Sequence, residues 1–376
     1  MIRATRYITF YTLLFLGHSA TNGQPAQTTK PPMSEEVFKN VQVLKGIPAD
    51  EFMSTMGIFS AALGMSCENC HVANDSKWEN YAGDNTPTKI TARRMVSMMQ
   101  GINKSFFNGR QVVTCYSCHR GGERPKTTPN LEALNGMMPE EEADDIVTPA
   151  PGAPNPEQIL DKYIRALGGP QKLAAILSIA GKGNSSGYGP ESEKRPYEIY
   201  AKVSGQRTTI IHTRSGDNTT TYDGRSAWQA APLRPIDVMP VTGGELEGAK
   251  FEVALAFPAQ LKQALGQWRV GRSTTIEGRK VQVVQGTSAG GMLATLYFDD
   301  ETGLLVRQLR YANSPVGRIP TQVDYADYRD VNGVKMPFRW MLYWLDGKEN
   351  VELTELQANS NIDAAKFNRP AASKAP

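Results

Sequence analysis

The segment TCYSCHRGG, residues 114–122, places a histidine directly behind a Cys-x-x-Cys pair, and SCENCH, residues 66–71, repeats the arrangement. The 376-residue chain has four cysteines and four histidines, so the two copies use every cysteine and half of the histidines. Their first cysteines, Cys67 and Cys115, are 48 positions apart. The repeat indicates that one structural unit occurs twice in the N-terminal part of the chain.

The pattern Cys-x-x-Cys-His is typical of covalent attachment of c-type haem. Two thiols about one turn apart add to the haem vinyl groups, and the adjacent histidine becomes the proximal iron ligand. A redox-active Cys-x-x-Cys pair or a four-cysteine zinc site needs no histidine behind each pair, and neither do disulfides. We therefore expect two covalently attached haems c. The attachment residues are then Cys67, Cys70, Cys115 and Cys118, and the proximal ligands are His71 and His119.

A count of the remaining histidines limits the sixth iron ligands. Only His18 and His212 remain, the first in a predicted export signal and the second in the predicted strand RTTIIHT, where a hydrogen-bonded structural role is favoured. Bis-histidine coordination of both haems is therefore excluded within one chain, which leaves methionine, water or a rarer ligand. The helices predicted ahead of the motifs carry methionines, namely Met53 and Met56 before the first and Met95, Met98 and Met99 before the second.

Methionine on a helix face more often fills a core than binds a metal. Its placement ahead of both motifs nevertheless favours ligation. Coordination by histidine and methionine raises the reduction potential of a haem, which suits a carrier that accepts electrons and binds no oxygen.

The beginning of the chain resembles an export signal over residues 1–26. Arg3 and Arg6 precede the apolar stretch YITFYTLLFLG, and the small and polar segment HSATNGQPAQ follows. An uncleaved anchor is the alternative. No other segment is apolar enough to span a membrane, so we expect a periplasmic protein that is soluble or peripherally membrane-associated. A net charge of +3 without a basic tract gives no reason to expect a nucleic-acid partner.

Three regions differ in residue composition and hydrophobic pattern, and together they predict a multidomain chain. Residues 34–122 are expected to form an all-α c-type cytochrome domain, with helices over 34–46, 48–64 and 88–107. Residues 123–155 are rich in proline and acidic residues, and this composition predicts a linker.

Residues 156–376 predict an α+β domain with a curved antiparallel sheet. After a helix at residue 156, short alternating strands are separated by turn pairs such as Asn332-Gly333 and Asp346-Gly347. The segments TLYFDDETGLLVRQLRY and QVDYADYRDVNGVKMPFRWMLYWL predict hairpins, and one longer helix is expected near EVALAFPAQLKQAL.

The two segments NVQVLKGIPADEFMSTMGIFSAALGMSCENCH and TARRMVSMMQGINKSFFNGRQVVTCYSCHRGG resemble the cytochrome c subunit of photosynthetic reaction centres. The resemblance covers about 85 residues and the first two-haem half of that four-haem family. It implies that Met56 and Met95 are the sixth ligands. Two haem motifs of the family are absent from this chain, KSFFNGRQVV lacks the family's histidine, and the predicted β-rich domain is additional.

The C-terminal half is similar in pattern to periplasmic lipoprotein carriers, whose curved sheet holds an apolar ligand. Trp268, Trp340, Trp344 and Phe338 are candidates to line such a cavity, although strand tryptophans are more often core residues.

The residues together predict an electron-transfer protein rather than an enzyme, with no catalytic residues. The resemblance implies a redox partner, either a reaction centre whose photo-oxidised pigment it re-reduces or another membrane electron-transfer complex. Two alternatives remain open at this point: a dihaem peroxidase-like enzyme, and a carrier of lipid or quinone with accessory haems.

Overall fold

The computed structural model describes residues 30–72, 78–125, 127–128, 146–187, 193–232 and 234–372. The predicted signal, residues 1–26, and residues 129–145 of the predicted linker lie outside the described residues. No helix among the described residues is both long and apolar enough to cross a membrane.

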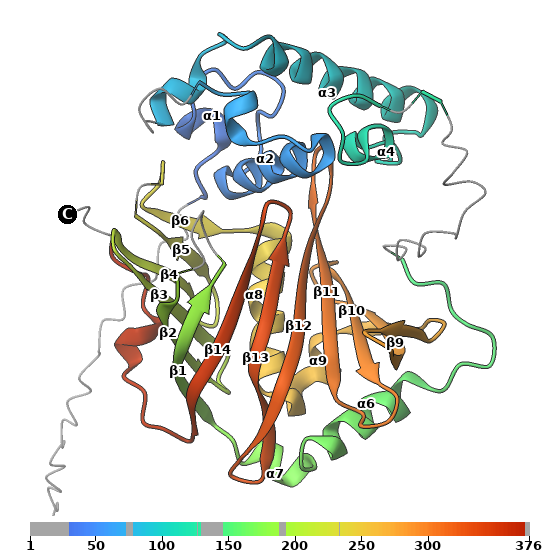
Figure 1. Ribbon diagram of the computed structural model, residues 1–376, viewed down its shortest axis with the longest axis vertical. Coiled ribbons are helices and arrows are strands. Elements are labelled where there is room, and N and C mark those ends of the chain that lie inside the picture. The colour runs from blue at the N-terminus through green and yellow to red at the C-terminus, as the bar shows by residue number, and fades with distance from the viewer. Residues whose placement is uncertain are drawn as a thin grey trace, which may run out of the picture. The chain divides into compact units, whose positions relative to one another are not determined.

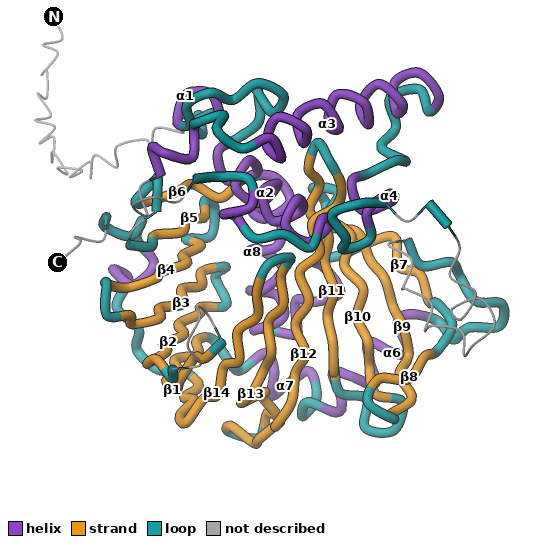
Figure 2. The backbone as a smooth tube through the Cα atoms, turned by 45° about the horizontal axis from the view of Figure 1, so that its top comes forward, coloured by secondary structure: helices purple, strands orange, loops and turns teal. Residues whose placement is uncertain are grey.

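Fourteen strands of the described chain form one antiparallel sheet, which is curved (Figures 1 and 2). Its order is β6-β5-β4-β3-β2-β1-β14-β13-β12-β11-β10-β9-β7, and β8 pairs with β9. The strands are β1 (Ser178–Ser186), β2 (Arg195–Lys202), β3 (Gln206–Thr213), β4 (Gly216–Tyr222), β5 (Ala227–Ala230), β6 (Val238–Val241), β7 (Gly266–Val270), β8 (Thr274–Ile276), β9 (Arg279–Thr287), β10 (Leu293–Asp299), β11 (Leu305–Ser314), β12 (Gly317–Val331), β13 (Val334–Trp344) and β14 (Gly347–Ala358). The α+β class and the curved antiparallel sheet are confirmed for the C-terminal half.

Helices occupy the N-terminal part and one face of the sheet (Figure 1). The N-terminal set consists of α1 (Ser34–Val37), α2 (Ala49–Leu63), η1 (Cys67–Asn69), η2 (Trp78–Ala82), α3 (Pro87–Phe106) and α4 (Cys115–His119). The second set consists of α6 (Pro156–Ala166), α7 (Pro170–Ala174), α8 (Gly243–Ala256), η3 (Pro258–Gln260), α9 (Leu261–Ala264) and η4 (Ala364–Phe367). The main core lies between α6–α9 and the sheet, and Leu160, Phe251 and Phe298 are among its most buried members.

The predicted hairpins are present because their turns contain residues that accept a left-handed backbone. Between β12 and β13, Asn332 and Gly333 have φ values of 55° and 79°, and Val331 pairs directly with Val334. A two-residue turn of this kind matches the twist of antiparallel strands. The hairpin predicted around DDETG is also present, as β10 and β11.

Two of the three predicted N-terminal helices are confirmed. Helix α2 follows Pro48 and ends at Gly64, which has a φ of 63°, and α3 begins with Pro87 at its first position. Proline suits the start of a helix and a left-handed glycine suits its end.

The helix predicted over residues 34–46 was wrong, because α1 ends at Val37. The following chain folds back instead of continuing the helix. The hydroxyl of Ser34 donates to the carbonyl of Leu44 at 2.7 Å, and the N–H of Gly46 donates to the Glu35 carboxylate at 2.8 Å. These contacts satisfy the backbone in a loop and thereby replace the helical hydrogen bonds.

The long helix predicted near residues 252–265 is interrupted. Helix α8 ends at Ala256, and Pro258 begins the short turn η3. Proline disfavours the helical conformation of the residue before it, and Phe257 accordingly has φ −124° and ψ 76°.

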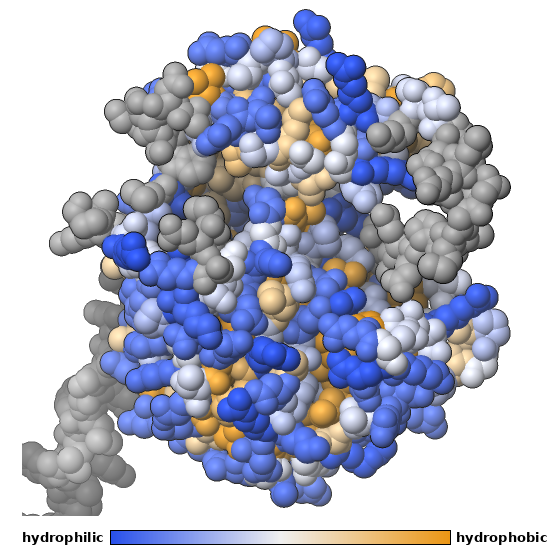
Figure 3. Space-filling view, in the orientation of Figure 1, coloured by the Kyte–Doolittle hydropathy of each residue, from blue (hydrophilic) through white to orange (hydrophobic). Residues whose placement is uncertain are grey.

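A second hydrophobic cluster joins the N-terminal helices to the sheet, and we call it the shared core. Its buried members are Leu44, Ile58, Val96, Met99, Ala312, Val316 and Ile319. The last three come from the tip of the β11–β12 hairpin, which reaches the N-terminal helices in Figure 1. Figure 3 shows apolar side chains where the helical part meets the sheet. Residues 31–376 accordingly form one compact unit.

Two polar contacts reinforce the shared core. The buried carboxylate of Asp50, in the first turn of α2, accepts hydrogen bonds from the N–H of Thr242 at 2.6 Å and from its hydroxyl at 2.9 Å. Burial raises the pKa of Asp50, although the hydrogen bonds from Thr242 act in the opposite direction. The amide of Gln111 donates to the carbonyl of Ser314 at 2.8 Å. These contacts fix the hairpin and α8 against the helical part.

The shared core predicts that the two parts unfold together. Replacing Ile58 by alanine should lower the free energy of unfolding by about 2–4 kcal/mol, because it leaves a cavity among buried side chains. Urea denaturation followed by circular dichroism should show one transition in which helix and sheet signals shift equally. The matched control is Leu177→Ala, because Leu177 is 59% exposed. A sheet transition that stays in place while the helical signal shifts would show that the parts are independent.

Candidate haem-binding sites

The first motif forms a single tight turn, η1, and a capping box holds its start. The N–H of Ser66 donates to Oδ1 of Asn69 at 2.8 Å, which is the reciprocal contact of a capping box. The carbonyl of Cys67 accepts from the N–H of Cys70 at 3.2 Å and from that of His71 at 2.9 Å. This turn brings the two thiols and the imidazole of the motif together.

The second motif forms the short helix α4, and a similar cap starts it. The N–H of Ser117 donates to Oγ1 of Thr114 at 3.3 Å, and the N–H of Thr114 donates to Oγ of Ser117 at 3.1 Å. Arg120 and Gly121, with φ values of 48° and 80°, end the helix directly behind His119. In both motifs, therefore, the residue before the first cysteine and the second residue between the two cysteines hold the turn together.

The ends of α2 and α4 meet at a contact between two glycines. The N–H of Gly121 donates to the carbonyl of Ala62 at 2.9 Å. A Cβ atom on Gly64 would lie 2.3 Å from the Gly121 carbonyl oxygen, and Gly64 also has a left-handed backbone. Only glycine fits this position, so the end of α2 lies directly against the second motif.

Both motif histidines present the same nitrogen for metal binding. Nδ1 of His71 lies 2.9 Å from the carbonyl oxygen of Tyr81, and Nδ1 of His119 lies 3.1 Å from that of Gly122. A carbonyl only accepts, so each Nδ1 carries the proton and each Nε2 keeps its lone pair. Metal-binding histidines are commonly oriented in this way.

The surroundings of His71 keep its imidazole neutral. Burial lowers the pKa of His71, and the positive charges of Lys89 and Arg93 lower it further, whereas the hydrogen bond to Tyr81 raises it. The imidazole also stacks on the Tyr81 ring, with centroids 4.8 Å apart. Metal ligation requires the neutral imidazole, so these contacts favour a ligand role.

Met56 and the first motif line one cavity of about 1650 Å³. Its wall includes Cys67, Cys70 and His71, and Met53 lies in the same wall. The volume exceeds the roughly 300–1000 Å³ of common ligand pockets. The two thiols, the imidazole with an available Nε2 and the thioether of the same wall are the kinds of group that a haem c requires.

Three methionines of α3 differ in exposure. Met99 is only 4% exposed and belongs to the shared core, whereas Met95 and Met98 are 37% and 50% exposed. The Met99 side chain is thus occupied in packing, while Met95 and Met98 are accessible at the surface of α3. The structure brings Cys115 against the shared core as well, and burial raises the pKa of this thiol to about 11.

The arrangement of the cysteines gives no zinc centre. All four are free thiols, and among the described residues no group of three or more His, Cys, Asp and Glu side chains is placed to hold a metal ion. His212 lies in β3, and its Nδ1 is 2.8 Å from a carboxylate oxygen of Asp217, in keeping with a hydrogen-bonded structural histidine.

Asn103 is a positioning residue that the sequence patterns did not indicate. Its buried amide donates to the carbonyl of Val113 at 2.7 Å, and its Oδ1 accepts from the N–H groups of Val112 and Val113 at 3.1 and 2.9 Å. The segment held in this way leads directly into Cys115. Backbone carbonyls and N–H groups have no sequence signature, so only the lack of an obvious role for a buried helical asparagine could have pointed to it.

Replacing Asn103 by alanine should destabilise the protein by about 2–3 kcal/mol, because three backbone groups of Val112 and Val113 lose their buried partner. Asn103→Asp should cost less, since it keeps the acceptor oxygen. The measurement is urea denaturation, and Ser97→Ala, an exposed change on the same helix, is the control. Equal stability of Asn103→Ala and the control would contradict the positioning role.

Comparison with known proteins places the motif-bearing part among cytochromes. Residues 14–143 match the family model of the photosynthetic reaction centre cytochrome C subunit. The photosynthetic reaction center cytochrome c subunit of Thermochromatium tepidum is 34% identical over 123 residues, which are 31% of this chain and 29% of that protein. Cytochrome c-554 of Chloroflexus aurantiacus is 31% identical over 106 residues, 27% of this chain and 24% of that protein. The chain thus spans less than a third of these relatives.

The C-terminal half has a different structural neighbour. A LolA superfamily protein from Nitrosomonas europaea aligns with a TM-score of 0.40 and 13% identity, covering 57% of this chain and 98% of that one. The N-terminal part of the chain is similar to the cytochrome c subunit of photosynthetic reaction centres, so the resemblance inferred from its two haem motifs is confirmed.

Proposed function

We propose that the chain is an exported, periplasmic c-type cytochrome that transfers single electrons through two haems. The observation that carries this proposal is the shared geometry of the motifs. Each one has two thiols on one turn and an imidazole whose Nδ1–H is bound to a carbonyl. A haem bound there would supply one-electron chemistry, while the chain tethers the porphyrin and fixes the proximal ligand.

Met56 and Met95 are the proposed sixth ligands. Met56 is supported by its place in the cavity wall that also contains Cys67, Cys70 and His71. Met95 is supported by its exposure on α3, in contrast to the buried Met99. A methionine on both irons leaves no open coordination position, which a peroxidase would need. The proposal is therefore a carrier and not an enzyme.

The redox partner is proposed from charge and from the relatives. Residues 87–122 contain six basic residues and no acidic one, namely Lys89, Arg93, Arg94, Lys104, Arg110 and Arg120. Lys89 and Arg93 pair with Asp84. The same segment carries exposed apolar side chains such as Phe106, at 78% exposure. This surface suits the acidic face of a redox protein, such as a membrane electron-transfer complex or a reaction centre.

A second candidate function, the carriage of an apolar ligand, is favoured by the extent of the cavity. It continues from the first motif along the inner face of the sheet, where Trp340 and Trp344 line it. Trp268 and Phe338 instead pack in the main core, and Phe338 lies under the guanidinium of Arg329 at 4.5 Å. Two of the four predicted cavity residues therefore line the cavity.

The haem content and spectrum of the purified protein test the first proposal. We expect two haems per chain, both six-coordinate and low-spin, with the methionine–iron band in the oxidised state. Met56→Ala and Met95→Ala should each convert one haem to a high-spin or water-ligated form and lower its reduction potential. The controls are Met53→Ala and Met98→Ala, neighbouring methionines on the same two helices.

Two results would contradict these assignments. If a control variant rather than its partner loses the band, the ligand is the other methionine. If the protein matured in a haem-attaching host is colourless and carries no added mass, the cytochrome proposal itself fails.

A further inference from the structure

We propose that the inner face of the sheet binds a neutral amphipathic molecule, whose carbonyl or hydroxyl head is held by Gln308, Arg310 and Tyr325. The head group could be a quinone ring or a glyceride, which share this chemistry. The inference rests on the second candidate function, the carriage of an apolar ligand. It does not depend on the haems.

Gln308 has no hydrogen-bond partner although it is completely buried. Its side chain comes from β11 and lines the cavity, with 0% exposure. Neither its amide nitrogen nor its amide oxygen forms a hydrogen bond of good geometry, although the hydroxyl of Tyr325 lies nearby. An unpaired buried amide costs about 1–3 kcal/mol, so buried polar groups are rarely left in this state. A ligand oxygen would accept a hydrogen bond from its amide nitrogen, and a ligand hydroxyl would in addition donate one to its amide oxygen.

Arg310 offers a second unpaired group beside Gln308. Its Nε has no partner, while its other nitrogens lie 2.8 Å from Glu245 and 3.8 Å from Glu252. Arg207 pairs with Glu252 at 2.7 Å. Two positive and two negative side chains therefore balance in this cluster, so an anionic head group would gain no net attraction. The cluster favours a neutral polar group.

A glycine in helix α8 leaves room for this cluster. A Cβ atom on Gly248 would lie 2.5 Å from the guanidinium of Arg310, so the guanidinium rests directly on the backbone of α8. Burial and the charge of Glu252 raise the pKa of Tyr325, which keeps its hydroxyl protonated as a donor. The polar groups are thus fixed in place before a ligand arrives.

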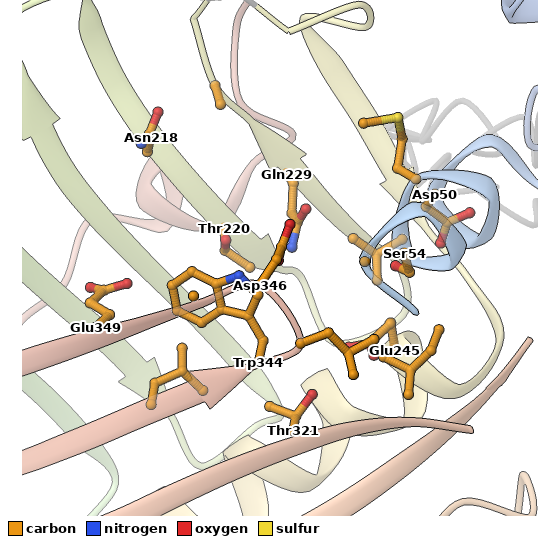
Figure 4. A pocket seen from close by; sticks show the side chains of 18 of the residues that line it. Asp50, Ser54, Asn218, Thr220, Gln229, Glu245, Thr321, Trp344, Asp346 and Glu349 are labelled. Atoms are coloured by element: carbon orange, nitrogen blue, oxygen red, sulfur yellow. The ribbon is translucent and has the colours of Figure 1, made fainter. Parts of the chain in front are cut away.

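One part of the remaining wall suits an apolar tail. It includes Ile199, Leu255, Val323, Leu342, Trp340 and Trp344. Figure 4 shows part of the wall, with Thr220, Gln229 and Asp346 around the indole of Trp344. A volume of about 1650 Å³ accommodates a long chain as well as a ring. A polar cluster with balanced charge inside an apolar cavity is the arrangement expected for an uncharged lipid-type molecule.

The test uses the full-length, haem-loaded protein after delipidation. Quenching of tryptophan fluorescence would report binding of decyl-ubiquinone, of a monoacylglycerol and of diphenylhexatriene, a hydrocarbon probe without polar groups. Gln308→Leu should weaken binding of the quinone or of the glyceride by about tenfold, because one or two hydrogen bonds are lost. Binding of the hydrocarbon should be unchanged, and the variant should be at least as stable as the parent, because an unpaired amide is removed.

Gln285→Leu is the matched control. Gln285 is a buried glutamine on β9 whose amide is already paired, with Val147 at 3.1 Å and Thr295 at 2.9 Å. This variant should lose stability and keep its affinity for all three probes. If Gln308→Leu weakens binding of only the quinone or only the glyceride, that compound represents the class of ligand that the site binds.

The proposal is overturned if Gln308→Leu destabilises the protein as Gln285→Leu does and leaves every affinity unchanged. It is also overturned if neither head-group ligand binds the parent protein. The haem spectrum of the same samples is an independent reading, so failure here leaves the electron-transfer proposal untouched.

Discussion

The structure depends on the insertion of the β11–β12 hairpin tip into the N-terminal helices. Val316 and Ile319 complete a hydrophobic cluster around Ile58 that the short helical part does not close by itself. A chain segment of fewer than about 100 residues buries a limited share of its apolar surface, so a partner surface adds much to its stability. Met56 and Cys115 both pack against this cluster. The shared core therefore also supports a proposed iron ligand and a proposed attachment residue.

The elements predicted correctly from the sequence are those with local signals. Pro48 and Gly64 bound α2, and Asn332-Gly333 forms the turn between β12 and β13. The helix expected over residues 34–46 failed because its backbone is satisfied by distant contacts, such as the one between Ser34 and Leu44. The shared core could not be predicted for the same reason. The hairpins predicted from the sequence are β10–β11 and β12–β13, whereas the β11–β12 tip was not predicted and its partners lie far away in the sequence.

The candidate site likewise contains residues with a local sequence signal and residues without one. The cysteines and histidines of the motifs are assigned to haem sites because covalent attachment needs them at fixed local spacing, and this assignment stays a prediction. The capping contacts of Thr114 with Ser117 became apparent only in the structure. Asn103 and Gln308 gave no signal, because what distinguishes them is which backbone or side-chain groups surround them. Such information exists only in three dimensions.

The late position of the hairpin in the chain has a consequence for biogenesis. Ile58 and Ile319 belong to the same cluster but are separated by 261 positions, so the cluster closes only after most of the polypeptide has been made. Contacts between distant segments also form slowly during folding. For the proposed attachment of haem, this order leaves the thiols of both motifs accessible to a maturation system before the β11–β12 hairpin closes the cluster.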